Sequence, residues 1–77
     1  MRIQVVFHAS LRNLLPEEAK GRTALEVRAG SRVSDLMQAL AVPSSVICAV
    51  NGRTEPDRNR VLADGDEVRF LRPSGGG

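Results

Sequence analysis

The chain has 77 residues, of which 42% are hydrophobic and 26% charged, and its eleven lysines and arginines against nine acidic residues give a net charge of +2. This length provides material for one small core, so we expect a single folded domain and no global disorder. The scattered basic residues and the lack of Trp and Tyr argue against direct nucleic-acid binding, and no apolar run approaches the roughly 18 residues that span a bilayer.

The first third of the chain predicts two strands joined by a long connection. Residues 2–7 alternate polar and apolar side chains, which indicates a strand with one buried face. Residues 10–15 carry leucines at helical spacing before Pro16 and Gly21 interrupt, so we expect a short helical turn and a loop. Residues 23–28 alternate again and predict a second, half-buried strand.

An amphipathic helix is predicted over residues 33–41. Apolar residues recur there at i, i+3, i+4 and i+7 from Val33, which places them on one face of a helix. Ser31 and Ser34 are both candidate N-caps, and Pro43 ends the helix.

The second half of the chain predicts short strands separated by turns. Residues 46–50 form an apolar run followed by Asn51 and Gly52, as expected of a strand and a tight turn. Residues 53–59 are polar and are expected to form a loop, and residues 60–62 have the pattern of a minimal edge strand.

The last predicted strand covers residues 67–71, directly after a turn at residues 64–66. Two early strands, one helix and a final strand beside the first predict an α+β protein of the β-grasp (ubiquitin-like) type, with a mixed sheet of four to five strands. We expect a domain over residues 1–72 and a flexible Gly-rich tail over 73–77. The predicted core consists of Ile3, Val5, Phe7, Leu25, Val27, Leu36, Leu40, Val50, Val68 and Phe70.

Residues with catalytic potential are few. His8 is the single histidine and lies in a connection expected to be exposed, and the single cysteine, Cys48, lies in an apolar run and is expected to be buried and inert. Glu17 and Glu18 are expected to be solvated, and no metal-binding pattern is present. We therefore expect a carrier or small subunit without a catalytic site of its own. The absence of a secretory signal and of a disulfide pair indicates a cytoplasmic protein.

The chain ends in Gly75, Gly76 and Gly77, directly after the last predicted strand and Pro73. Glycine has no Cβ, so such a tail can enter a narrow channel and carry its carboxylate with it. From Pro73 the extended tail would reach roughly 17 Å, at about 3.3 to 3.6 Å per residue. The alternative is an idle, Gly-rich end of an interaction module.

These residues resemble the ubiquitin-like sulfur carriers, which include the small subunit of molybdopterin synthase and the thiamin-pathway carrier. Residues 64–77 look like the small-subunit pattern D-G-D-E-V-x-F-x-P-P-x-x-G-G, and residues 7–12 are similar to its F-x-A-x-x-R segment. The V-N-G turn at residues 50–52 is shared more widely. The long connection over residues 8–22 favours the molybdopterin type, whereas Arg72 in place of the first proline, and the third glycine, depart from the pattern.

The resemblance implies a cycle centred on the Gly77 carboxylate. A ubiquitin-activating-type enzyme would adenylate it with ATP, and a sulfur donor would convert the adenylate to a thiocarboxylate that gives sulfur to an acceptor. The carrier itself would bind no cofactor, and the large subunit of molybdopterin synthase is a possible second partner. The residues implied to contact partners are Gly76, Gly75, Pro73, Leu71 and Phe70.

The resemblance leaves the pathway open. Molybdopterin synthesis is the leading expectation, and thiamin synthesis, transfer RNA thiolation or another sulfur pathway is the alternative. A protein modifier that is joined to its targets through Gly77, as ubiquitin is, belongs to a different class of function.

Overall fold

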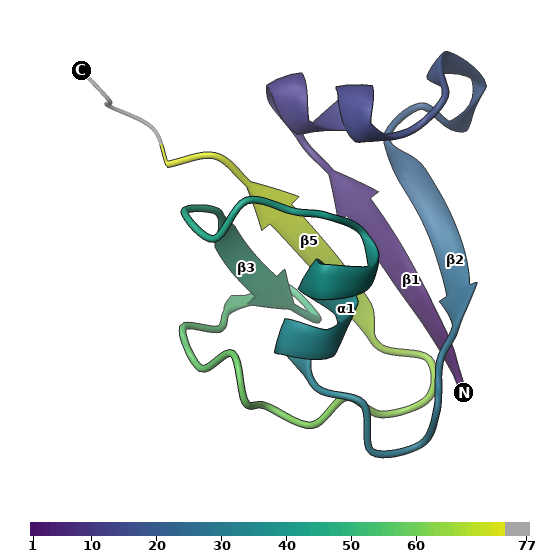
Figure 1. The fold of residues 1–77 in the computed structure, drawn as a ribbon, viewed down its shortest axis with the longest axis vertical. Coiled ribbons are helices and arrows are strands. Elements are labelled where there is room, and N and C mark those ends of the chain that lie inside the picture. The colour runs from purple at the N-terminus through teal and green to yellow at the C-terminus, as the bar shows by residue number, and fades with distance from the viewer. Residues whose placement is uncertain (74–77) are drawn as a thin grey trace.

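The computed structural model describes residues 1–73, which form one sheet with a helix lying across one of its faces (Figure 1). The first strand, β1 (Arg2–Phe7), leads into two short 3-10 helices, η1 (Ala9–Leu14) and η2 (Glu17–Ala19), and then into β2 (Arg22–Glu26). The helix α1 (Val33–Ala39) follows, and after it come β3 (Ile47–Val50), β4 (Arg53–Thr54) and β5 (Glu67–Leu71). Among these described residues no helix is long and apolar enough to cross a membrane.

The described strands form a five-stranded sheet in the order β2-β1-β5-β3-β4. β1 and β5 are parallel, and the other neighbouring pairs are antiparallel, so the sheet is mixed as predicted. β5 is the last strand in the chain but lies between β1 and β3. Both of its edges are therefore hydrogen-bonded, which fixes the strand that leads into the C-terminal tail.

The core lies between the inner face of the sheet and α1. Alternation along each strand decides which side chains face it, because successive side chains of a strand point to opposite faces. Leu25, Val27 and Leu40, which were predicted as core, are only partly buried at its margin. The buried cluster consists of Ile3, Val5, Phe7, Leu11, Val33, Leu36, Met37, Val46, Cys48, Val50, Leu62, Val68 and Phe70.

The helix α1 begins at Val33 as predicted, but its end and the residue that caps its start differ from the prediction. The helix stops at Ala39 because Leu40 leaves it and Ala41 takes a positive φ of 56°, a conformation that no α-helix continues through. Neither predicted serine caps its start. The N-cap is Arg32, and its main-chain N–H donates to the Asp35 carboxylate at 2.8 Å, which satisfies one helix-end donor from inside the first turn.

The segment between β3 and β5 also departs from the prediction. β4 lies in the expected loop, where Arg53 and Thr54 pair with β3 across the turn at Asn51 and Gly52. The minimal strand expected over residues 60–62 is wrong, because this segment makes only a single bridge between Val61 and Arg32. The short pairing gained at β4 depends on turn geometry rather than on apolar periodicity, since both of its residues are exposed.

Candidate functional site

The root of the C-terminal tail is held by the middle of the sheet. Phe70 pairs with Phe7 of β1, and Leu71 pairs with Ile47 of β3. The main-chain N–H of His8 also donates to the carbonyl of Phe70 at 3.1 Å. Because β1 and β5 are parallel, the chain leaves β5 at the end of the sheet where η1 lies (Figure 1). A tail anchored in this way starts from a fixed point.

Arg72 and Pro73 follow β5 and are both exposed. The predicted contact residue Pro73 therefore stands free of the sheet, at the point where the tail begins. Gly75, Gly76 and Gly77, on which the sequence-based site depends, lie outside the described residues.

The aromatic side chain of Phe70 is not part of the surface. It is 0% exposed and stacks against Phe7, with 5.7 Å between the ring centroids. The prediction that Phe70 lies in the core is therefore confirmed, and its side chain is not available for the partner contact that the resemblance implied. The physical reason is the alternation of the strand, which turns Phe70 to the core together with Val68.

Leu71, the next residue along β5, points to the outer face of the sheet, opposite α1. It is half-buried, and its cross-strand neighbour Ile47 is 39% exposed. We call this pair the Leu71–Ile47 patch. No sequence motif singles out Ile47, because only strand pairing places it beside the tail root.

Polar side chains border this patch on the same face. The Arg69 Nε donates to a Glu67 carboxylate oxygen at 2.7 Å, and Arg69 Nη1 lies 3.5 Å from Nε2 of His8. His8 is half-buried rather than in an exposed connection. The outer face next to the tail thus combines apolar and charged groups.

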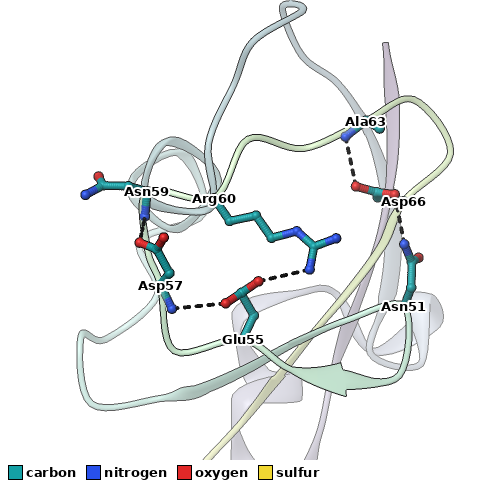
Figure 2. A network of polar contacts seen from close by, with 7 residues as sticks. All are labelled: Asn51, Glu55, Asp57, Asn59, Arg60, Ala63 and Asp66. Atoms are coloured by element: carbon teal, nitrogen blue, oxygen red, sulfur yellow. Dashed lines mark hydrogen bonds and ion pairs between the residues drawn. The ribbon is translucent and has the colours of Figure 1, made fainter.

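Two sequence motifs meet at the other end of β5 (Figure 2). The side-chain amide of Asn51 donates to the Asp66 carboxylate at 2.9 Å and accepts from the main-chain N–H of Glu67 at 2.9 Å. The second Asp66 oxygen accepts from the N–H of Ala63 at 2.8 Å, and Asp64 accepts from the N–H of Arg2 at 2.6 Å. The V-N-G and D-G-D-E segments therefore fasten the start of β5, and the carboxylates of Asp64 and Asp66 hold this junction together.

A second polar network stiffens the loop before β5. The Glu55 carboxylate accepts from Arg60 Nη1 at 2.9 Å and from the N–H of Asp57 at 3.3 Å, and the Asp57 carboxylate accepts from the N–H of Asn59 at 2.9 Å (Figure 2). These contacts close the loop on itself, so its acidic side chains are engaged in shaping it.

The remaining candidates for chemistry are not arranged as a catalytic site. Cys48 is buried at 1% exposure, and burial raises the pKa of its thiol, which disfavours the reactive thiolate. Glu17 and Glu18 are exposed, as predicted. Within residues 1–73, no group of three His, Cys, Asp or Glu side chains is placed to hold a metal ion.

Within residues 1–73, one α-helix packs on a mixed sheet whose last strand lies in the middle and leads towards the glycine tail, and this arrangement defines a ubiquitin-like β-grasp protein. The chain belongs to the ThiS family, whose model matches residues 5–77. This match bears out the resemblance to ubiquitin-like sulfur carriers. A comparison with curated protein sequences gave no match.

Solved structures agree on the fold. A protein assigned as molybdopterin converting factor subunit 1 from Pyrococcus furiosus is 26% identical, with 95% of this chain and 98% of that chain covered and a TM-score of 0.78. SAMP1 from Haloferax volcanii is 18% identical, with 100% of both chains covered and a TM-score of 0.78. The complex of subunits 1 and 2 of molybdopterin-converting factor from Helicobacter pylori contains a chain that is 19% identical, with 100% of both chains covered and a TM-score of 0.69. The predicted β-grasp fold is confirmed.

Proposed function

We propose that this protein carries sulfur as a thiocarboxylate on Gly77, for the synthesis of molybdopterin. The observation that carries the proposal is the tail root: in a chain of the ThiS family, the central strand β5 presents exposed Arg72 and Pro73 beside the Leu71–Ile47 patch. Because the root is fixed, a partner can hold the domain while the glycines extend into the partner's active site. Pro73 restricts the backbone at that root, which lowers the entropy lost when the tail is bound.

The chemistry needs a partner because a carboxylate is a poor electrophile. The Gly77 carboxylate attacks the α-phosphorus of ATP and releases pyrophosphate, which gives an acyl adenylate. A sulfide-equivalent nucleophile then attacks the acyl carbon, and AMP leaves with the electron pair of the broken C–O bond. The product is a thiocarboxylate, whose sulfur is a stronger nucleophile than the oxygen it replaced. An adenylating enzyme of the ubiquitin-activating type supplies the ATP site.

The assignment to molybdopterin rests on likeness. The Pyrococcus furiosus chain with 26% identity is assigned as a molybdopterin converting factor subunit. The connection between β1 and β2 is long and contains η1 and η2, and a long connection at this place favours the molybdopterin-type carrier. The Helicobacter pylori structure holds subunits 1 and 2 together, which supports a large subunit as a second partner.

Intact-mass measurement tests the proposal. The protein is incubated with ATP, a sulfide source and the adenylating enzyme of the source organism, and we expect the mass change of one oxygen replaced by sulfur. A variant lacking Gly76 and Gly77 is the control, and it should keep the thermal transition of the full chain while gaining no sulfur. A wild-type protein that remains unchanged in mass, or a truncated one that still transfers sulfur, would contradict the role of Gly77.

The pathway is tested separately by growth complementation. Strains lacking the molybdopterin, thiamin or transfer RNA thiolation carrier are each supplied with this chain, and we expect rescue of molybdopterin synthesis. Rescue of thiamin or transfer RNA thiolation alone would keep the carrier chemistry and reassign its acceptor. Peptides from target lysines linked to Gly77 in cell extract would instead indicate a protein modifier.

A further inference from the structure

The strand β2 forms one margin of the sheet, and its outer edge has no neighbouring strand among residues 1–73 (Figure 1). An unpaired edge exposes main-chain N–H and C=O groups to which another strand can bind. The opposite margin is β4, which has only two residues. The five residues of β2, Arg22–Glu26, are therefore the longer of the two open edges in the described part of the chain.

The ladder between β1 and β2 decides which main-chain groups of β2 face outwards. Opposite residues of an antiparallel ladder alternate between hydrogen-bonded and non-hydrogen-bonded pairs. At one end of this ladder the N–H of Phe7 donates to the Gly21 carbonyl at 2.7 Å, and at the other end the N–H of Val27 donates to the Met1 carbonyl at 2.8 Å. Every second residue between Gly21 and Val27 therefore bonds to β1. The residues that alternate with these, and whose N–H and C=O groups face the open edge, are Arg22, Ala24 and Glu26.

The side chains of these three residues form a charge pattern that is complementary to itself. They lie on the outer face of the sheet, since their partners on β1 alternate with the core residues of that strand. Among residues 1–73, Arg22 takes part in no ion pair, and Glu26, whose side chain is 73% exposed, pairs only with the N-terminal ammonium group at 3.8 Å. The small side chain of Ala24 lies midway between the two charges.

We propose that two copies of this chain pair edge to edge through β2, in an antiparallel register centred on Ala24. A two-fold axis at Ala24 places Arg22 of each copy opposite Glu26 of the other. In this register Ala24 faces Ala24, and Arg22 faces Glu26, as hydrogen-bonded pairs, because all three residues direct their N–H and C=O groups outwards. Charge complementarity selects a second copy as the occupant. An edge with charges of one sign would repel its own copy, whereas this edge brings opposite charges together at both ends.

The inner face of β2 fits the same register. Thr23 and Leu25 are both half-buried, and Leu25 packs at the margin of the core. The pairing places Leu25 of each copy opposite Thr23 of the other, so that the exposed parts of both side chains leave water. The tail root stays outside the contact, because β1 separates β2 from β5. The dimer would therefore present two tail roots from one continuous sheet.

Sedimentation velocity of the full-length chain measures this association. The contact uses one short strand of each copy, so we expect a weak dimer that forms between about 10 µM and about 1 mM protein. Amide hydrogen exchange locates the contact. With rising protein concentration, exchange should slow at the outward amides of Arg22, Ala24 and Glu26, and it should stay unchanged at Thr23 and Leu25, which are already bonded to β1.

Exchanging the two charges supplies matched variants. Arg22→Glu should weaken dimerisation about tenfold at about 0.1 M salt, because it places like charges opposite each other at both ends of the contact. The double variant Arg22→Glu with Glu26→Arg has the net charge of the wild type and should restore dimerisation to within about threefold. Arg53→Glu, on the exposed strand at the opposite margin, changes the net charge as much as Arg22→Glu and should stay within about twofold of wild type.

Ala24→Pro tests the main-chain pairing without a change of charge. The proline ring removes the central outward N–H, which makes no hydrogen bond to β1, so the domain should fold and the dimer should be lost. Thermal melting shows whether each variant is folded, and the charge variants decide the matter if Ala24→Pro is not.

Three results would overturn the inference. These are a wild-type chain that stays monomeric up to about 1 mM, a dimer that Arg22→Glu and Arg53→Glu affect equally, and a double variant that associates no more tightly than Arg22→Glu. Slowed exchange at amides outside β2 alone would also count against it. None of these measurements involves a reaction at Gly77, so their outcome is independent of the proposed carrier function.

Discussion

Replacing Asn51 by Ala should destabilise the domain by about 3 kcal/mol, because this residue both makes a turn and ties it to β5. The side-chain amide of Asn51 makes hydrogen bonds to the Asp66 carboxylate and to the Glu67 N–H, and both are exposed. The low ends of the usual ranges of hydrogen-bond free energy therefore apply, about 1.5 kcal/mol for the bond to the charged group and about 0.5 kcal/mol for the other. The φ of 52° at Asn51 is left-handed, which costs an alanine roughly 1 kcal/mol more. A domain of this size has about 4 to 12 kcal/mol of stability, so the loss is a large share.

Urea unfolding followed by far-UV circular dichroism measures this loss. Asn51→Gly keeps the backbone freedom but loses the amide, so it should lie between wild type and Asn51→Ala. Asn59→Ala is the matched control, because the described contacts of Asn59 use only its main chain, and its stability should stay within about 0.5 kcal/mol of wild type.

The reasoning would be refuted by a loss below about 0.5 kcal/mol in Asn51→Ala with an unchanged denaturant slope. Such a result would mean that β5 is held in place without this residue. The shared V-N-G and D-G-D-E patterns would then need another explanation than mutual hydrogen bonding.

Three further outcomes are expected. Gly21→Ala should lower the melting temperature more than Gly65→Ala, because both residues have positive φ but only at Gly21 would a Cβ lie 2.8 Å from a main-chain oxygen; equal losses would show that the backbone yields there. Phe70→Ala should lower the free energy of unfolding by about 3 to 5 kcal/mol in urea unfolding. Leu71→Ala should change stability little and weaken binding to the adenylating enzyme. A larger stability loss for Leu71→Ala than for Phe70→Ala would contradict the assigned faces. Burial raises the pKa of the Cys48 thiol in the folded protein, so the unfolded chain ionises first, above about pH 8.5, and folding stability should fall from there as pH rises. The wild type should therefore lose stability more steeply with pH than Cys48→Ala, and parallel pH profiles would count against this.

The local pattern of the sequence predicted most of the fold. The faces of β1 and β5 follow from alternation, which is why Val5, Phe7 and Val68 were expected in the core and are found there. The helix was found from its periodicity, but its cap was missed because Asp35 acts through its carboxylate from within the first turn. β4 was missed because two exposed residues carry no periodic signal.

The sequence by itself also determined the candidate chemistry, since the glycine tail and the motif before it point to a carrier without any knowledge of contacts. Only the tertiary structure decided which surface accompanies that tail. It placed Ile47 beside Leu71, and it brought Arg22 and Arg69 to either side of Val6. Strand pairing is non-local, so the neighbours of a residue across a sheet cannot be read from its neighbours in the chain.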